Sequence, residues 1–384
     1  MKRKQIATLV NQALQETIGE TAVVNDDLSN IVDIGKTLPD STSVNAVYSS
    51  IFDKIGKTIV ESPNAKKGLN LKVDDWEYGE ILEKIRIEIP EAEENPSWSL
   101  TKGTSYDCFK FSPLSAKAKY YTFGTTFEVD LSVPDIQMKD SFRDASSMNT
   151  FIDHQHDTVR KATNSYSALM EYRCLNNMIG LMFHKNHGIV DLLAKWNAEN
   201  AGTQLTKDNC MANADFKRFC AKTIKLYGDY ISDLSMLYNA DGYPTQTEEA
   251  DKRQIFLADF IRELETSSFS TTFNDGYLKL GDYTTVSDWQ GSGTDGSFKE
   301  RSKIDVTVKI DDSGSTAAIK KQGIVGVLFD IRGCCVNRRN YRVLSNPVPK
   351  GEFTNFYYKF DASYINDTAE NFIIFTIGDG TVEA

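Results

Sequence analysis

A proline-free stretch of 38 residues, 148–185, constrains the fold most strongly, because its apolar side chains recur with the period of an α-helix. A serine just before it can cap the helix, and Gly188 lies just beyond its end. At about 1.5 Å per residue the predicted helix spans roughly 55 Å. Helices of compact domains average about 11–12 residues, so this helix is expected to have exposed flanks that need partners.

Residues 78–90 change to a period of two, which predicts a β-strand with two different faces. One face carries Ile81, Ile85, Ile87 and Ile89, and the other carries Leu82, Lys84, Arg86 and Glu88. Further strands are expected at 106–111 and 121–131, and the segment 91–96 is polar and turn-prone. The pattern predicts a long β-hairpin over 78–131 with a polar tip. Such a hairpin is not stable by itself, so it must dock on another surface.

The N-terminal 20 residues predict a short amphipathic helix with a narrow apolar stripe, made of Ile6, Leu9, Val10, Leu14 and Ile18. A polar tether leads to a second short helix expected near 44–59. Neither helix can form a core of its own. We therefore expect an arm that becomes ordered only where another surface covers the stripe, because ordering costs about 1–2 kcal/mol per residue.

The rest of the chain predicts a mixed α+β fold. Helices are expected at 214–238 and 248–265, separated by Pro244, and strands are expected at 304–310, 324–331, 353–360 and 371–377. A polar link is expected between the second and third of these strands.

Composition and motifs exclude several classes of protein. The net charge is −11 and no long Lys/Arg cluster is present, so a protein that grips nucleic acid is not expected. Six scattered cysteines indicate free thiols in a reducing compartment, and the sequence predicts neither a signal peptide nor a membrane span. The histidines His154 and His156 would lie about 200° apart on a helix and could not share a metal ion. No catalytic motif is evident, so we expect no enzyme activity, no metal and no cofactor.

Three segments carry a resemblance to a known family. WEYGEILEKIRIEIPEAEENPSW at 76–98 is similar to the extended loop of phi-twenty-nine-like short-tailed phage capsid proteins, and GIVGVLFDIRGCCVNRRNYRVLSNPVPKGEFTNFYYKF at 323–360 with NFIIFT at 371–376 is similar to their C-terminal block. Together with the order of elements over 70–380, the chain resembles the major capsid proteins of tailed bacteriophages. That resemblance implies the HK-ninety-seven-type fold, which has an N-terminal arm, an extended β-hairpin (the E-loop), a peripheral domain with a long spine helix, and an axial domain.

Mapped onto this chain, the resemblance implies five segments. They are an N-terminal arm at 1–70, the E-loop and adjoining strands at 71–131, the peripheral domain with its spine helix at 132–190, further peripheral helices and the axial domain at 191–350, and C-terminal strands at 351–384 that return to the peripheral domain.

Contacts between subunits are the candidate sites that the resemblance implies. The residues expected there are Leu9, Leu14, Trp76, Tyr78, Lys84, Arg86, Trp98, Arg338 and Arg339. The two arginines, with Arg342, pair with acidic residues across subunits or lie in a solvated loop. Some relatives form a covalent crosslink from an E-loop lysine, and the phi-twenty-nine-like group is not expected to do so.

The function implied is self-assembly into an icosahedral or prolate shell of pentamers and hexamers around the double-stranded DNA of a tailed phage. The expected partners are other copies of the chain, a scaffolding protein and a portal protein, with packaged DNA nearby but not specifically bound, and no membrane. Assembly is expected in the host cytoplasm and the final location in the virion. Two alternatives stay open: an encapsulin-like nanocompartment shell protein, and a soluble β-rich carbohydrate-binding or enzymatic domain that uses the 11% aromatic content.

Overall fold

The computed structural model describes residues 3–18, 23–25, 27, 29–30, 33, 47, 50, 68–69, 71–73, 81–87, 109, 113, 116–122, 124–137, 145–269, 281–290, 297–310 and 314–381. These residues fall into two compact units. Unit 1 comprises Met1–Tyr78, Gly124–Tyr172 and Val336–Tyr364, and unit 2 comprises Gly79–Phe123, Arg173–Cys335 and Ile365–Ala384.

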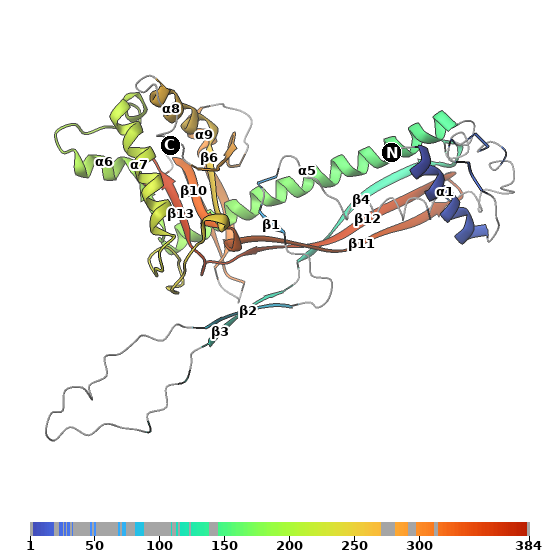
Figure 1. Ribbon diagram of the computed structural model, residues 1–384, viewed down its shortest axis with the longest axis horizontal. Helices are drawn as coiled ribbons and strands as arrows, with labels where there is room; N and C mark the ends of the chain where they lie inside the picture. The colour runs from blue at the N-terminus through green and yellow to red at the C-terminus, as the bar shows by residue number, and fades with distance from the viewer. Residues whose placement is uncertain are drawn as a thin grey trace. The chain divides into compact units, whose positions relative to one another are not determined.

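Unit 1 is built on a four-stranded sheet in the order β1-β11-β12-β4. Its strands are β1 (Lys72–Val73), β4 (Thr125–Pro134), β11 (Cys334–Val348) and β12 (Phe353–Asn366), of which the last two extend into unit 2. The helix α5 (Ala145–Lys185) lies along this sheet (Figure 1). Phe127 of β4 joins the two layers, since its ring centroid lies 5.2 Å from that of Tyr166 on α5 and 5.5 Å from that of Phe360 on β12.

Unit 2 has a five-stranded mixed sheet in the order β5-β13-β10-β6-β7. The strands are β5 (Ile189–Asp191), β13 (Phe372–Thr376), β10 (Ile324–Asp330), β6 (Lys252–Leu257) and β7 (Thr284–Val286). Every residue of β10 and β13 is buried, so these two strands form the centre of the core. Around the sheet lie α6 (Leu192–Glu199), α7 (Ala214–Tyr230), α8 (Ala258–Phe269) and α9 (Phe298–Arg301), with 3-10 turns η2 (Cys210–Ala212), η3 (Glu249–Asp251) and η4 (Ile331–Gly333).

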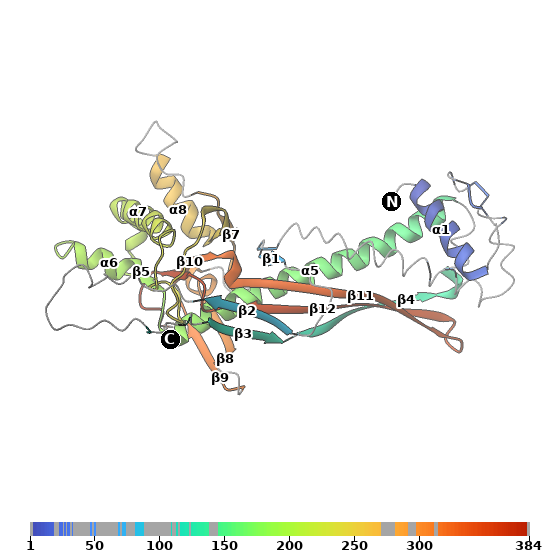
Figure 2. The same ribbon diagram turned by 60° about the horizontal axis from the view of Figure 1, so that its bottom comes forward.

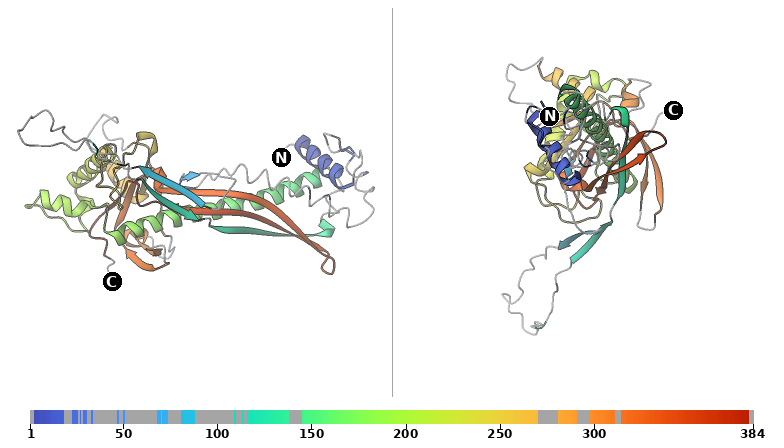
Figure 3. Two further views of the ribbon diagram at one scale, coloured as in Figure 1. Left: turned by 90° about the horizontal axis from the view of Figure 1, so that it is seen from below. Right: turned by 90° about the vertical axis from the view of Figure 1, so that its right-hand side faces the viewer.

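Two hairpins complete unit 2. The strands β8 (Ile304–Lys309) and β9 (Thr316–Lys321) form a separate ribbon (Figure 2). This ribbon packs closely on α5 at Gly180, where an added Cβ would lie 2.7 Å from Cγ2 of Val306. The strands β2 (Ile81–Ile87) and β3 (Ala116–Thr122) pair as a second antiparallel ribbon (Figure 3).

Several sequence predictions are confirmed. The long helix begins at Ala145 and runs for 41 residues, roughly 60 Å at 1.5 Å per residue. The N-terminal helix is α1 (Arg3–Ile18), and the strands predicted at 78–90, 304–310, 324–331, 353–360 and 371–377 correspond to β2, β8, β10, β12 and β13. Of the helix predicted at 44–59 the structure describes only residues 47 and 50, both helical, and of the strand predicted at 106–111 only residue 109, which lies in a turn; the rest of both ranges is outside the described residues.

The helix predicted over 248–265 is wrong in its first half, which forms η3 and then β6. Ile255 and Phe256 share the apolar spacing of a helix with residues further along, so local pattern alone favoured a helix. In the structure they are buried inside the sheet, where β6 pairs with β10 on one side and β7 on the other. Burial on both faces of a central strand overrides the local preference.

The strand predicted over 121–131 is two strands that belong to different sheets, β3 with β2 and β4 with β12. Gly124 lies between them. A Cβ at Gly124 would lie 2.2 Å from the backbone oxygen of Ala362, so only glycine permits this close approach. Two further differences are that the helix predicted over 214–238 ends at Tyr230 and that the expected polar link is the long strand β11.

The arm also differs from its prediction. Ala7, Val10, Ala13 and Leu14 of α1 are buried within the chain, and the Asn11 side chain bonds both the backbone N–H and the carbonyl of Val24. For Val10 and Leu14, the two members of the predicted stripe whose side chains are described, the expectation that they stay uncovered until a neighbour arrives is therefore wrong.

Candidate functional site

The ribbon of β2 and β3 gathers positive charge on one face. In its antiparallel register Lys84 lies opposite Lys119, and Arg86 lies opposite Lys117. Directly opposed like charges destabilise a two-stranded ribbon. This face therefore needs anions close by.

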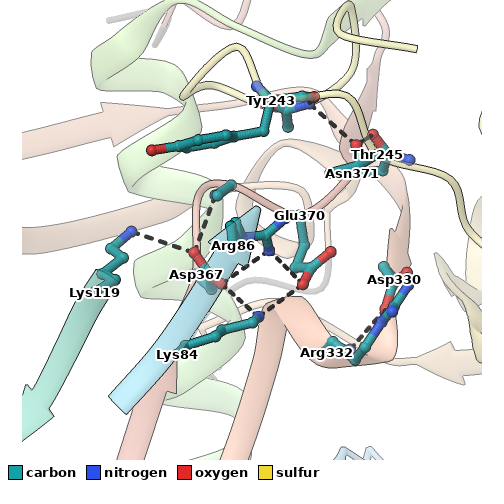
Figure 4. Close-up of polar contacts among 12 residues, drawn as sticks. Lys84, Arg86, Lys119, Tyr243, Thr245, Asp330, Arg332, Asp367, Glu370 and Asn371 are labelled. Carbon is teal, nitrogen blue, oxygen red and sulfur yellow. Dashed lines mark hydrogen bonds and ion pairs between the residues drawn. The ribbon is translucent and has the colours of Figure 1, made fainter. Parts of the chain in front are cut away.

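Two buried acids supply them from the turn between β12 and β13. Nζ of Lys84 lies 2.5 Å from Oδ2 of Asp367 and 2.7 Å from Oε1 of Glu370. Nη2 of Arg86 lies 2.5 Å from Oε1 of Glu370 and 3.3 Å from Oδ2 of Asp367, and Nζ of Lys119 lies 3.2 Å from Oδ1 of Asp367 (Figure 4). We call these five residues the anchor cluster.

Asp367 is the centre of the anchor cluster. Burial of its carboxyl group opposes ionisation, but the charges of Lys84 and Lys119 and the backbone N–H of Ala369 outweigh burial, and the pKa of Asp367 falls well below its usual value. Its ionised form is therefore the one that the folded chain stabilises.

A third acid, Asp241, extends the network. Its carboxylate binds Nζ of Lys185 at 2.5 Å and Nζ of Lys119 at 3.3 Å, and it accepts a hydrogen bond from Thr368 Oγ1. Burial works against ionisation here too, yet these partners lower the pKa of Asp241.

An aromatic ring lies against the same cationic face. The guanidinium of Arg86 lies 5.6 Å and Nζ of Lys117 5.1 Å from the ring centroid of Tyr243. Such cation–π contacts add about 0.5–1 kcal/mol each at partly exposed sites. Tyr243 is held in place because its backbone N–H and C=O both bond the buried amide of Asn239, which also binds Thr245.

The opposite face of the ribbon faces solvent and is largely apolar, with one carboxylate, Glu83, that accepts a hydrogen bond from the hydroxyl of Tyr120. Ile85, Ile87 and Tyr120 are 59%, 62% and 62% exposed. An ordinary surface hairpin buries its apolar face and exposes its charges, and the β2–β3 ribbon does the reverse. Its outward face is therefore available to a partner.

Within the described parts of the chain, no group of three or more histidine, cysteine or acidic side chains is arranged to hold a metal ion. The helices described there include none with both the length and the apolar character needed to cross a bilayer.

The model of the family described as Phi29-like phage major capsid protein matches residues 6–376. The chain belongs to this family. It therefore has the structural role of a capsid protein, a subunit of the homo-oligomeric shell of a phage virion. The resemblance identified in the sequence is confirmed, and the nanocompartment and carbohydrate-binding alternatives are not supported.

Solved structures agree on the fold. In the capsid structure of Staphylococcus phage Andhra, a chain with 12% sequence identity matches with a TM-score of 0.55, covering 81% of this chain and 84% of that one. In the structure of the head fiber and inner core protein gp22 of native bacteriophage P68, a chain also with 12% identity matches with a TM-score of 0.52, covering 80% and 83%. A comparison with curated proteins found no match. The predicted mixed capsid fold is confirmed.

For this member of the family, the candidate contact residues occupy different environments. Lys84 and Arg86 lie in the anchor cluster. Leu14 is buried in α1. Leu9 lies on α1 and Arg339 on β11, but their side chains are outside the described part of the structure, as are Trp76, Tyr78 and Trp98 altogether. That any of these residues contacts a neighbouring subunit stays a prediction.

Arg338 is buried in β11, with Nη2 3.5 Å from Oε1 of Glu171 on α5. The alternative of a solvated loop is therefore wrong for this residue. Burial raises the pKa of Glu171, although the N–H of Leu69, 2.7 Å from Oε2, and the charge of Arg338 act in the opposite direction.

Sequence reasoning missed Asp367, Glu370 and Lys119. The one available signal was the pair of acids in the short turn before the last apolar strand, opposite in charge to β2. Lys84 and Asp367 are 283 positions apart, so nothing local connects them.

Proposed function

We propose that the β2–β3 ribbon is the base of the E-loop, fixed to its own subunit by its cationic face and docked on a neighbouring subunit by its apolar face. The observation that carries this proposal is that the two faces of the ribbon have different environments: the cationic face is bound to buried acids, and the isoleucine face is exposed. The anchor cluster holds the charged face against buried acids, which leaves Ile85 and Ile87 on the outside.

The energetics favour this arrangement. Full burial of an isoleucine side chain contributes about 1.5–3 kcal/mol, so two isoleucines repeated at every subunit contact give a substantial driving force for assembly. The anchor cluster limits the freedom of the ribbon before it docks, which lowers the entropic cost of association.

Further assignments belong to the same proposal. The shell is icosahedral or prolate and encloses double-stranded DNA, a scaffolding protein and a portal act in its assembly, and assembly takes place in the host cytoplasm. The net charge of −11 supports a wall that stays close to packaged DNA without binding it tightly. The proposal also keeps the expected N-terminal arm, peripheral domain and axial domain. The paired strands of the E-loop are limited to β2 and β3, because β4 pairs with β12.

The proposal predicts that the double substitution Ile85→Ser, Ile87→Ser leaves the monomer folded but prevents closed particles from forming. Both side chains are exposed, so thermal unfolding of the monomer should shift little. Particle yield, measured by sedimentation and electron microscopy, should fall more than about tenfold, because about 1.4 kcal/mol lost per contact already costs that factor.

The matched control is Ile85→Val, Ile87→Val, which keeps the face apolar and should assemble normally. Normal particle yield from the serine variant would contradict the proposal.

A further inference from the structure

Two buried thiols meet inside unit 2, where α5 lies against the start of β11. Cys174 of α5 and Cys334, the first residue of β11, are both free thiols and both buried. Burial by itself assigns nothing, because a free cysteine commonly packs as a small apolar side chain. What distinguishes these two is that the same neighbours hold both of them.

Asn366, the last residue of β12, brings the two thiols together. The backbone N–H of Asp367 donates to the carbonyl of Gly333 at 2.9 Å, so Asn366 lies beside Cys334 where the neighbouring strands β11 and β12 meet. Sγ of Cys174 donates to Oδ1 of Asn366 at 3.0 Å, and Nδ2 of Asn366 donates to the carbonyl of Cys174 at 3.1 Å. Asn366 therefore fixes the Cys174 thiol next to Cys334.

The two thiols also contact each other. Burial and a hydrogen bond to the Cys174 side chain both raise the pKa of the Cys334 thiol well above its ordinary value. A buried thiol that keeps its proton reacts slowly, since the thiolate is the reactive form. The pair is therefore stable as two thiols while its surroundings are reducing, and it is closed to bulky reagents.

The adjacent Cys335 points elsewhere. Its Sγ lies 3.4 Å from the carbonyl oxygen of Arg332 and 3.7 Å from that of Ile331, both in the turn η4. Successive side chains of a strand point to opposite faces, which separates Cys335 from its neighbour Cys334. The structure thus singles out Cys174 and Cys334 as one pair and offers Cys335 as its internal control.

We propose that Cys174 and Cys334 are a redox modification site, which a small peroxide converts to a disulfide within one chain. One thiol sulfur attacks an oxygen of the peroxide, so that an S–O bond forms, the O–O bond breaks and water leaves. The second thiol sulfur attacks the resulting sulfenic acid, so that the S–S bond forms, the S–O bond breaks and a second water leaves. The two thiols are oxidised by two electrons in total, and hydrogen peroxide is reduced to water.

The site goes beyond the shell role and is independent of how the β2–β3 ribbon docks. Thiols persist in a reducing cytosol, whereas disulfides persist in oxidising surroundings, which a virion meets once it is outside a cell. The disulfide would join α5 to β11 directly behind the turn that carries Asp367 and Glu370. Because the two cysteines are far apart in the sequence, the bond would also restrict the unfolded chain and stabilise the folded one.

The test treats the purified full-length chain with hydrogen peroxide and digests it with trypsin under non-reducing conditions. Cleavage after arginine and lysine places Cys174 in the peptide 174–185 and Cys334 with Cys335 in the peptide 333–338. The expected product is these two peptides joined, lighter by two hydrogens than their sum and separated again by a reductant. The melting temperature of the oxidised chain should rise by about 5 °C.

Two matched variants identify the partner of Cys174. Cys335→Ala should keep the joined peptides, and Cys334→Ala should lose both the joined peptides and the rise in melting temperature. A joined product that survives in Cys334→Ala would overturn the proposal. So would a wild-type chain that remains unlinked, whether its thiols stay reduced or Cys174 stops at a sulfenic or sulfinic acid. None of these readouts requires a shell, so failure of assembly contradicts only the proposed function.

Discussion

Arg338→Ala is expected to lower the free energy of unfolding by about 3–5 kcal/mol, because it leaves a buried carboxylate without its cation. Arg338 and Glu171 are both buried, and Nη2 of Arg338 lies 3.5 Å from Oε1 of Glu171. Among the described residues, the hydrogen bond from the N–H of Leu69 is the one that the carboxylate would keep. Urea unfolding followed by circular dichroism measures the change.

The loss should depend on pH. Burial raises the pKa of Glu171 above its ordinary value of 4.5, and removal of Arg338 should raise it further. Between pH 4.5 and the raised pKa of the folded variant, the carboxyl group of Glu171 is ionised in the unfolded chain but not in the folded chain. The free energy of unfolding therefore falls as pH rises above about 4.5. Arg338→Ala should therefore be more destabilised at pH 8 than at pH 5.

The control for this prediction is the double variant Arg338→Met, Glu171→Gln, which removes both charges and keeps an acceptor for the N–H of Leu69. It should regain most of the lost stability. An Arg338→Ala variant that is as stable as the wild type at both pH values would contradict the buried pairing.

Asp367→Asn is expected to release the β2–β3 ribbon without unfolding the rest of unit 2. Three cations lose a charged partner, since Asp367 binds Lys84, Arg86 and Lys119. These cations are partly exposed and therefore partly screened, so we expect a loss of about 2 kcal/mol. Hydrogen exchange of the β2 and β3 amides should then be about 30-fold faster, at 1.36 kcal/mol per factor of ten.

The lowered pKa of Asp367 also predicts that the β2–β3 ribbon becomes less stable in acid. Because the folded chain lowers the pKa of Asp367, its contribution is complete above the ordinary value of 3.8 and is lost as pH falls below that value toward the folded-state pKa. The wild-type ribbon should become labile in that window, and the ribbon of Asp367→Asn should change less.

Asp241→Asn is the matched comparison for Asp367→Asn, because Asp241 lies in the same network but contacts only Lys119 among the ribbon cations. It should accelerate exchange of the ribbon less than Asp367→Asn. Equal exchange of the ribbon in the wild type and Asp367→Asn would argue against the anchor cluster.

The sequence predicts elements whose cause is local. The helix α5 follows from uninterrupted helical periodicity and an absence of proline, and the two faces of β2 follow from strict alternation. Both signals depend on neighbours within a few residues. The resemblance to capsid proteins likewise depends on the order of such elements.

The remaining features depend on contacts between distant residues. The alternation in β2 does not say which face is buried, because acids 283 and 286 positions away decide it. Arg338 lies in a polar stretch that suggested a loop, but Glu171, 167 positions earlier, gives it a buried partner. The local sequence of β6 predicts a helix, but the segment forms a strand because it pairs with β10 on one side and with β7 on the other.

The most direct test of the central claim is a cryo-electron microscopy reconstruction of the shell formed by the wild-type chain. The account predicts that Ile85 and Ile87 of each subunit lie within about 4.5 Å of apolar side chains of a neighbouring copy. It also predicts that Lys84 and Arg86 remain bound to Asp367 and Glu370 of their own chain. A shell in which the isoleucine face is open to solvent, or in which the cationic face forms the subunit contact, would contradict it.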